Sequence, residues 1–428
     1  MRRALLALVL VSLVGSCDAV QDKPTAAADA ACEGAAKAAD CDPPGEMVTH
    51  QFPDHPLGKF EEVSPCMAWT LDNDKALYVR GVTFFNQGAF HHSNWFVVPE
   101  KMFKGEDGYF KCADRQFDEG VAAMLGTVLY AQSTQSYLET QRLPAGVVVK
   151  IPPRHRVIGG AHLLNLSAGE RVTSARMSLE LVHPRDVKTI VSPLRLTYAD
   201  LQIPANKQSR HTGECALNKP YESWLGRPLD MKIYYVLPHY HGLGNYFRLE
   251  VMGGPNDGKA FMELSGFNAE ANGALFDPPI DLTGAEGLRM TCGYNNTTDK
   301  KVGWGIGDQE MCVFLALVES GAMMDGNVKK HNPTETIEDG ITQYTSVCDT
   351  FAVPKNPKQN MPGQDEVDAE LYKPKTKSGD KGLKPAETCK DSDPSVTAQQ
   401  PATLQSIRET VFVPSCSYSA CHGGAVAH

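Results

Sequence analysis

The sequence predicts an all-β protein built from two tandem antiparallel, jelly-roll-like β-sandwich domains. From Phe52 to Val318, short β-prone runs follow one another with Gly, Pro, Asn or Asp between them, and long helical periods are scarce. Many short strands separated by turn residues are typical of antiparallel sandwiches. Roughly 270 residues of this kind suffice for two such domains, which we place at residues 51–200 and 201–320.

Short runs rich in β-branched and aromatic residues, which favour strands, carry this prediction. In chain order they are residues 76–79, 95–98, 146–149, 178–182, 232–237, 247–251 and 312–318. Polar stretches without an apolar period flank the sandwiches, and we interpret them as a tether at 18–50 and a linker at 321–400. We expect both to be disordered.

Composition and charge exclude some classes of protein. The chain has 428 residues, of which 42% are hydrophobic, enough for two or three domains with sizeable cores. A net charge of -10 argues against nucleic acid as a partner, because a protein that binds the phosphate backbone needs a basic face. The 12 cysteines favour an exported protein with disulfides over a protein of a reducing cytosol.

The N-terminus has the pattern of a secretion signal. A basic start is followed by the apolar run Ala4–Val14, which is too short to span a bilayer comfortably. The run ends in Val-Gly-Ser-Cys17, which resembles a lipobox, the signal for lipid attachment and cleavage at the cysteine. We therefore expect residues 1–17 to be a lipoprotein signal peptide and Cys17 to anchor the protein to a membrane of the bacterial cell envelope, on its periplasmic side or at the cell surface. An ordinary signal peptide with an incidental cysteine is the alternative.

Two pairs of histidines stand out as candidate metal ligands. His239 and His241 are two apart, so on a strand their imidazoles point to the same side and can reach one ion. The same parity carries Met231, Ile233, Tyr235 and Leu237, which predicts one continuous stripe facing a neighbouring sheet. His91 and His92 are adjacent and can bind one ion only if the strand twists or bulges there.

A single histidine, His162, and Met311 complete the set of candidate ligands. Imidazole suits copper, zinc, iron and nickel alike, whereas a soft thioether favours Cu(I). Two histidines with one methionine therefore indicate copper rather than zinc. Taken alone, each motif more often consists of ordinary surface or core residues than of metal ligands. The order of the motifs along the chain therefore carries the prediction.

That order resembles the copper type II ascorbate-dependent monooxygenases, the family of peptidylglycine hydroxylating monooxygenase and dopamine β-monooxygenase. The resemblance covers about 270 residues, with His-His, a single His, His-Xaa-His and Met following one another. Further matches are Val128-Leu-Tyr-Ala131 and Leu143-Pro-Ala-Gly-Val147, both ahead of the third histidine, and the stretch from Met290-Thr-Cys292 to Glu310-Met311-Cys312.

The resemblance implies ligands, disulfides and chemistry. His91, His92 and His162 would hold a first copper that stores and passes an electron, and His239, His241 and Met311 would hold a second copper that activates O2. An open cleft between the domains would receive the substrate, with ascorbate or another reductant as electron donor. The implied disulfides are Cys66–Cys112 and Cys292–Cys312, with Cys215–Cys348 as a further pairing.

Three positions depart from the amidating members of the family. An Arg that clamps the peptide carboxylate there is Leu237 here, and its Asn and Tyr partners are Val313 and Leu315. Apolar side chains cannot hold a carboxylate, which requires charge-assisted hydrogen bonds. A less polar substrate than a C-terminal glycine peptide is therefore expected.

The last segment, residues 401–428, ends in a further cysteine motif. Cys416-x4-Cys421-His422 resembles the haem-attachment motif of c-type cytochromes with a wider spacer. A c-type haem there could feed electrons to the first copper. A plain Cys416–Cys421 disulfide is the alternative, because only six residues follow His422.

The leading prediction is a copper monooxygenase that hydroxylates a small molecule or peptide with O2 and a one-electron donor. A non-catalytic copper-binding lipoprotein could use the same ligands. A copper and haem electron-transfer protein is the third possibility. Oxygen consumption coupled to product separates the first hypothesis from the other two.

Overall fold

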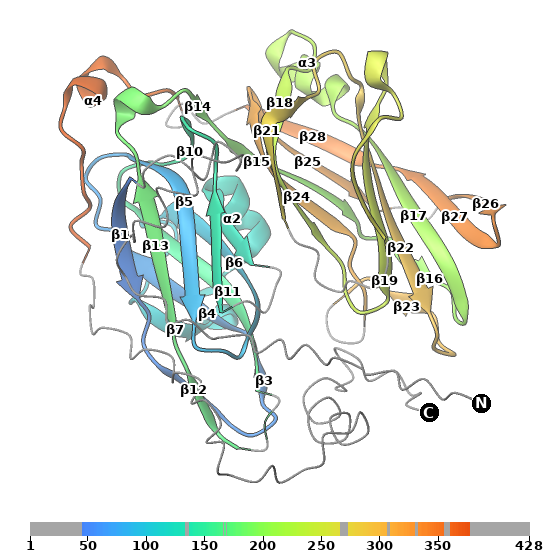
Figure 1. Cartoon of the computed structure of the whole chain (residues 1–428), viewed down its shortest axis with the longest axis horizontal. Helices are drawn as coiled ribbons and strands as arrows, with labels where there is room; N and C mark the ends of the chain where they lie inside the picture. The colour runs from blue at the N-terminus through green and yellow to red at the C-terminus, as the bar shows by residue number, and fades with distance from the viewer. Residues whose placement is uncertain are drawn as a thin grey trace, which may run out of the picture.

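Two β-sandwiches lie side by side in the computed structural model of the chain (Figure 1). The structure describes residues 45–132, 137–165, 167, 169–265, 273–305, 309–329, 333–354 and 360–376. The predicted signal peptide, Cys17 and the cysteine motif Cys416, Cys421 and His422 lie outside the described residues. The all-β prediction is confirmed, because strands dominate the described chain and its α-helices are short.

Two six-stranded sheets form the first sandwich. One sheet has the order β1-β13-β5-β10-β14, with β9 paired to β5; its strands are β1 (Glu46–Gln51), β13 (Ala175–Leu181), β5 (Leu77–Asn86), β10 (Val147–Ile151), β14 (Thr189–Ile190) and β9 (Leu138–Arg142). The other has the order β7-β4-β11-β6-β8, with β3 paired to β11; its strands are β7 (Gly108–Lys111), β4 (Pro65–Thr70), β11 (His155–Leu164), β6 (Phe90–Pro99), β8 (Thr127–Gln132) and β3 (Glu62–Val63). Buried aromatic side chains fill the space between the sheets, including Trp69, Phe84 and Trp95.

The second sandwich also has two six-stranded sheets. The sheet nearer the first sandwich has the order β21-β18-β24-β15-β25-β28; its strands are β21 (Ala274–Asp281), β18 (Met231–His239), β24 (Val313–Ser320), β15 (Ser192–Tyr198), β25 (Ala322–Val328) and β28 (Asp349–Pro354). The other has the order β20-β19-β22-β17-β27-β26; its strands are β20 (Ala260–Ser265), β19 (Gly244–Met252), β22 (Gly287–Asn296), β17 (Lys207–Ala216), β27 (Ile341–Val347) and β26 (Thr334–Glu338). Most pairings are antiparallel, and the parallel pairs are β10–β14, β15–β25 and β17–β27.

Short elements complete the described chain. Two small ribbons pair β2 (His55–Leu57) with β12 (Arg171–Thr173) and β16 (Gln202–Ile203) with β23 (Val302–Gly303). The α-helices are α2 (Glu119–Leu125), α3 (Asn218–Leu225) and α4 (Gln364–Asp368). Among the described residues, no helix has the length and apolar character needed to cross a membrane.

The predicted domain boundaries need correction. The boundary predicted at residue 200 places β15 in the first sandwich, but β15 pairs with β24 and β25 of the second. The predicted linker at 321–400 begins too early, because β25 to β28 complete the two sheets of the second sandwich. At the other end, β1 lies inside the predicted tether at 18–50 and pairs with β13.

The segment 360–376 returns to the first sandwich instead of forming a free linker. Glu366 of α4 accepts a hydrogen bond from the Tyr78 hydroxyl at 3.0 Å. Trp69 donates its indole N–H to Thr376 Oγ1 at 2.6 Å. The polar composition of this stretch concealed its docking, because side-chain hydrogen bonds rather than a long apolar run hold it.

A β-bulge divides the predicted apolar stripe of β18. Met231 and Ile233 point into the core of the second sandwich, whereas Tyr235 and Leu237 pack against the first sandwich. The pairing register with β24 shifts between Ile233 and Tyr235. One extra residue reverses the side-chain parity of a strand, so the expected single stripe is wrong. The bulge turns the end of β18, with His239, toward the first sandwich.

Candidate functional site

A bulge also shapes the first histidine group, as the sequence required. His162 on β11 pairs with His92 on β6, whereas the next residue, Leu163, pairs with Phe90. His91 is therefore the extra residue, and the local irregularity frees it from strict alternation. Its ring lies near that of His162 instead of on the far side of the sheet.

The three imidazoles of this group lie close together. The ring centres of His91 and His162 are 5.0 Å apart, those of His92 and His162 are 4.9 Å apart, and those of His91 and His92 are 5.5 Å apart. The nitrogens His162 Nδ1 and His92 Nε2 are separated by 3.1 Å. The structure therefore brings together the three residues that the sequence proposed for the first metal.

These spacings suit imidazoles that share an ion. With a metal–nitrogen distance of about 2.0 Å, two rings on one ion have centres roughly 4.5 to 5.5 Å apart. In the part of the chain that the structure describes, no group of three His, Cys, Asp or Glu side chains converges as a formed metal cage. Ion binding by the three imidazoles therefore requires a rearrangement of their rings.

Glu62 holds the third imidazole from behind. Its Oε1 atom lies 2.6 Å from His162 Nε2, while His162 Nδ1 faces His92. A carboxylate behind a ligating histidine fixes its orientation and its tautomer. Glu62 lies on the two-residue strand β3, which pairs with the end of β11.

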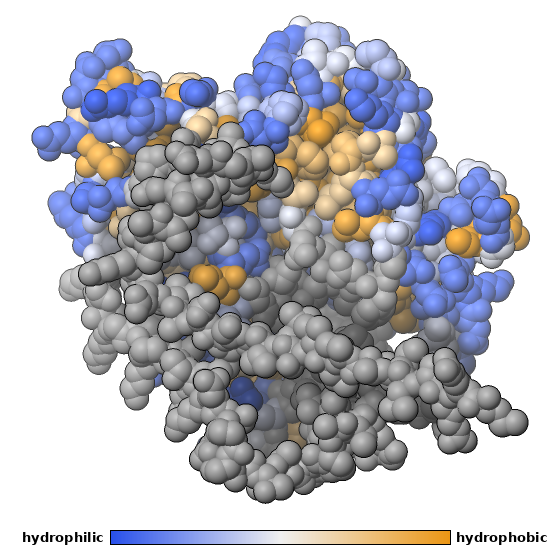
Figure 2. All heavy atoms as spheres, viewed as in Figure 1, coloured by the Kyte–Doolittle hydropathy of each residue, from blue (hydrophilic) through white to orange (hydrophobic). Residues whose placement is uncertain are grey.

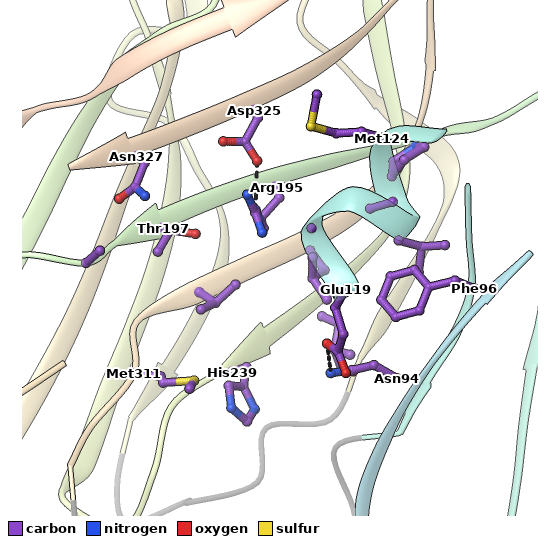
Figure 3. Close-up of a pocket in the computed structure, with 18 of the residues that line it drawn as sticks. Asn94, Phe96, Glu119, Met124, Arg195, Thr197, His239, Met311, Asp325 and Asn327 are labelled. Carbon is purple, nitrogen blue, oxygen red and sulfur yellow. Dashed lines mark hydrogen bonds and ion pairs between the residues drawn. The ribbon is translucent and has the colours of Figure 1, made fainter. Parts of the chain in front are cut away.

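The second group comes from the end of β18, the turn after it and the segment before β24. The ring centres of His239 and His241 are 5.2 Å apart. His239 pairs with Val313, and Met311 precedes Val313 by two residues. His239, His241 and Met311 all line one cavity, and Figure 3 shows Met311 and His239 on its wall.

Glu310 fastens these two segments to each other. Its buried carboxyl accepts backbone N–H bonds from His241 at 2.8 Å, Leu243 at 2.6 Å and Met311 at 3.3 Å. His241 Nδ1 lies 2.8 Å from the carbonyl oxygen of Gln309, which leaves Nε2 of that ring for an ion. The loop that carries His241 therefore cannot move independently of Met311.

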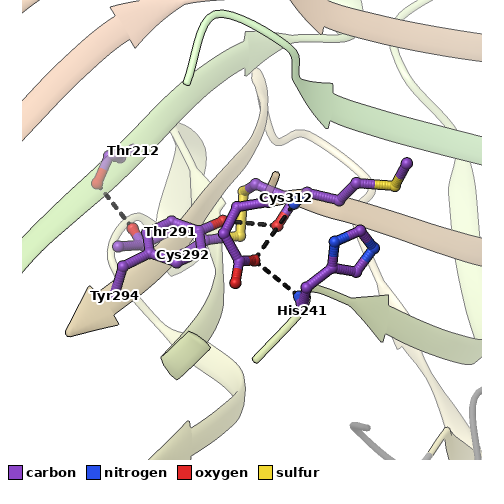
Figure 4. Close-up of a disulfide and its surroundings, with 8 residues drawn as sticks. Thr212, His241, Thr291, Cys292, Tyr294 and Cys312 are labelled. Atoms are coloured by element: carbon purple, nitrogen blue, oxygen red, sulfur yellow. Dashed lines mark hydrogen bonds between the residues drawn. A yellow bond between two sulfur atoms is a disulfide. The ribbon is translucent and has the colours of Figure 1, made fainter. Parts of the chain in front are cut away.

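A disulfide and a tyrosine hold the main chain at Met311 on both sides. Cys312, the next residue, is bonded to Cys292 on β22. The Tyr294 hydroxyl donates to the carbonyl oxygen of Met311 at 2.6 Å. Figure 4 shows this disulfide beside His241. The implied pairings Cys66–Cys112, Cys215–Cys348 and Cys292–Cys312 are all present, and such bonds fit an exported protein.

The two histidine groups are in contact with each other. The ring centres of His92 and His239, from different sandwiches, are 5.7 Å apart. Apolar packing of Tyr235 and Leu237 against the core of the first sandwich holds the domains in this position. The expected cleft exists as a cavity at the domain junction, but it does not separate the two groups.

Burial keeps four of these imidazoles neutral. It lowers the pKa of His239 to about 3 and that of His91 to about 4, and neighbouring imidazoles lower both further. The pKa values of His92 and His241 are lowered for the same main reason. Neutral imidazole is the form that binds a metal ion, so these four histidines are ready to act as ligands near neutral pH.

A cavity of about 660 Å³ opens beside the second group. Its floor is the outer face of the sheet β18-β24-β15-β25-β28, and α2 of the first sandwich covers it. Figure 2 shows apolar side chains gathered over this face. Leu237, Val313 and Leu315 line it close to His239. An ion pair lies farther along the sheet, with Arg195 two strands and Asp325 three strands from β18, and Arg195 Nε is 2.7 Å from Asp325 Oδ2 (Figure 3).

Sequence reasoning missed four polar residues of this region: Glu62, Glu119, Arg195 and the role of Glu310. Glu62, Glu119 and Arg195 do not belong to a short sequence pattern with a candidate ligand. Glu310 does, because it directly precedes Met311. Glu119 and Arg195 lie on elements that meet only through the packing of the two domains. Their neighbourhood therefore depends on a domain arrangement that the sequence pattern does not specify.

Comparisons with known proteins provide no family for this chain. No protein-family model matches the sequence, and none of the curated proteins does so. Similar solved structures include the major capsid protein P2 of bacteriophage PM2, with 10% identity, a TM-score of 0.26 and coverage of 64% of this chain and 98% of that chain. The PBSX exported protein XepA has 9% identity, a TM-score of 0.18 and coverage of 66% and 92%. The VP2 subviral particle protein of infectious bursal disease virus has 9% identity, a TM-score of 0.17 and coverage of 65% and 73%.

Proposed function

We propose that this chain is an exported, copper-dependent monooxygenase that hydroxylates a C–H bond of its substrate. The observation that carries the proposal is the meeting of His91, His92 and His162 with His239 and His241. Of these five, His92, His239 and His241 line one cavity. Met311, on the wall of the same cavity, adds a thioether sulfur. Imidazoles combined with a thioether select copper over zinc.

The residues present fit copper in three respects. The ring spacings match those of shared ligation, and burial keeps four of the five imidazoles neutral, those of His91, His92, His239 and His241. A carboxylate and a backbone carbonyl orient the rings of His162 and His241. Bound copper would supply the one-electron chemistry that O2 reduction requires. The chain itself positions the ligands, presents the substrate and limits the access of water.

The wall of the cavity favours a substrate with an apolar part at the reacting carbon. Leu237 and Leu315 are partners across the strands β18 and β24, and Val313 is the partner of His239. Any group that approaches the His239 end of the cavity meets these three side chains. Because burial of a carboxylate against them would leave its charge unpaired, a C-terminal glycine peptide is a poor fit.

The envelope location is part of the proposal. Cys17 would carry the lipid, and a c-type haem at Cys416, Cys421 and His422 would be one route for electrons to the copper centre. Ascorbate or another one-electron donor would be the alternative. The three disulfides support an oxidising compartment.

Copper-loaded protein tests the proposal directly. We expect ascorbate-dependent O2 consumption that is lost in His239→Ala, because this variant lacks one imidazole ligand of the second group. Substrate candidates with an apolar end are then screened for hydroxylated product. Copper binding without O2 consumption would indicate a copper-storing protein, and transfer of electrons to a partner without O2 consumption would indicate a redox relay.

A further inference from the structure

Glu119 is an acidic residue of the cavity that has no role in the ligand set. It is the first residue of α2, and its side chain points down to β6, where Asn94 Nδ2 donates to Glu119 Oε2 at 3.0 Å (Figure 3). Asn94 follows His92 by two residues on the same strand. Residues two apart lie on the same face of a strand, so Glu119 meets the face that carries His92.

A glycine on the neighbouring strand makes room for the carboxyl group. Gly160 pairs with Asn94, just as His162 pairs with His92. A Cβ atom at Gly160 would lie only 2.5 Å from Glu119 Oε1. The carboxyl therefore occupies the site of an absent side chain, roughly 7 Å along the strand from the His92–His162 pair.

The other acidic groups of the cavity are already engaged. Asp118 accepts the backbone N–H of Val121 at 2.8 Å as the N-cap of α2. Asp325 accepts from Arg195 at 2.7 Å. Of the acidic side chains that line the cavity in the described chain, Glu119 is the one without a cap or an ion pair.

Glu119 lies on the wall of the cavity, so its side chain is exposed to the cavity while protein atoms pack around it on the other sides. Burial raises the pKa of Glu119 to about 7, the Asn94 hydrogen bond lowers it, the Asp118 charge raises it and Arg195 from β15 lowers it. His92 on β6 and His239 on β18 face the same space and are neutral near pH 7. The carboxyl can therefore both hold and release a proton near neutral pH, and water in the cavity can return that proton.

We propose that Glu119 is the proton donor for oxygen reduction at the histidine and methionine centre, an inference that rests on the proposed function. Hydroxylation follows RH + O2 + 2e⁻ + 2H⁺ → ROH + H2O, with the electrons from a one-electron donor of the ascorbate class. One O–H bond of the reduced oxygen forms with the proton of Glu119, whose own O–H bond breaks. A proton from solvent, conducted by cavity water, then restores the carboxyl, and a second such cycle supplies the second proton of the balance. Without substrate the balance is O2 + 2e⁻ + 2H⁺ → H2O2.

The test uses copper-loaded full-length protein with ascorbate and O2 as the probes. At pH 7 we expect Glu119→Gln to lower the rate of O2 consumption at least about tenfold, since a positioned general acid contributes roughly 100- to 10,000-fold. Asp118→Asn is the matched control, because Asn caps a helix as well as Asp does, and its rate should stay within about twofold of wild type. Gly160→Ala, which displaces the carboxyl without removing it, should also lower the rate.

A second readout needs no metal. In metal-free protein, burial also raises the pKa of Glu310 to about 7, so two carboxyls should contribute to the infrared C=O band that titrates near neutral pH. The difference spectrum between wild type and Glu119→Gln isolates the contribution of Glu119, which should be present in wild type and in Asp118→Asn and lost in Glu119→Gln. A wild-type protein that consumes O2 while Glu119→Gln does so at the same rate overturns the role of Glu119 alone. A titrating band of the same size in wild type and in Glu119→Gln has the same consequence. A copper-loaded wild type that consumes no O2 overturns the proposed function and this inference together.

Discussion

The imidazoles of His92 and His239 meet edge to face across the junction of the two sandwiches, with ring centres 5.7 Å apart. This contact joins the two candidate metal groups into one cluster of five histidines. It depends on the bulge in β18, which turns Tyr235, Leu237 and His239 toward the first sandwich. The electron path between two metal ions held here would be short, and the cavity beside His239 would be the entrance for substrate.

Metal content tests the assignment of ligands. We expect wild type to bind about two copper ions per chain, and we expect His162→Ala and Met311→Ala each to lose one, as the division into an imidazole group and a thioether-containing group requires. Elemental analysis of purified protein measures both. His55, whose ring packs against Tyr109, is not a candidate ligand, so His55→Ala serves as the control. Equal copper content in all four proteins would contradict the assignment.

Glu62 should tune the first group without being a ligand itself. Glu62→Gln removes the negative charge behind His162, and loss of such a partner typically weakens metal binding about 10- to 100-fold. Competition titration with a copper chelator measures the change. Glu170→Gln, at an exposed position, controls for the loss of one acidic charge. An unchanged affinity in Glu62→Gln would mean that His162 keeps its orientation without the carboxylate.

The sequence predicted the class of fold and the six candidate ligands, but not how the domains meet. Adjacent His91 and His92 required a bulge, and the pairing register contains one at His91. Nothing in the sequence indicates the bulge in β18. Ile233, Tyr234 and Tyr235 all favour strands, and each can face either side of the sheet, so the position of the register shift cannot be predicted from them. Glu119 could not be predicted as part of the site, because it comes near the strand of His92 only through the packing of α2 on β6.

The Cys292–Cys312 disulfide should support Met311 more than it supports the fold as a whole. Replacement of both cysteines by Ala opens a loop with a sequence separation of 20 residues, which should cost about 3 kcal/mol of unfolding free energy. We also expect weaker Cu(I) binding, because Cys312 adjoins Met311. Urea unfolding and a Cu(I) competition assay measure the two effects.

The matched control removes Cys215–Cys348, a disulfide of the same sandwich with a sequence separation of 133 residues. Its loss should lower the unfolding free energy at least as much, because the closed loop is longer. Cu(I) binding should remain unchanged, since neither cysteine adjoins a candidate ligand. Equal losses of Cu(I) affinity in the two double variants would show that Met311 responds only to general destabilisation.

His50 should make the stability of the metal-free protein depend on pH. Its ring stacks on Trp69 with centres 4.8 Å apart, it is 8% exposed, and neither ring nitrogen has a hydrogen-bond partner among the described residues. Burial lowers its pKa to about 4, an effect that the charge of Asp107 partly offsets. In the unfolded chain the pKa returns to about 6.5, so the unfolded state gains a proton first as the pH falls.

The sign of the effect follows from that difference in proton affinity. The contribution of neutral His50 to stability is complete above pH 6.5 and is lost as the pH falls from 6.5 toward 4. Between pH 7.5 and pH 5 this one group should lower the unfolding free energy by about 2 kcal/mol. His50→Phe keeps an aromatic ring against Trp69 and cannot be protonated, so it should lose correspondingly less stability over this interval in urea unfolding. Parallel pH curves for wild type and variant would mean that His50 is protonated equally in the folded and unfolded states, in conflict with its burial.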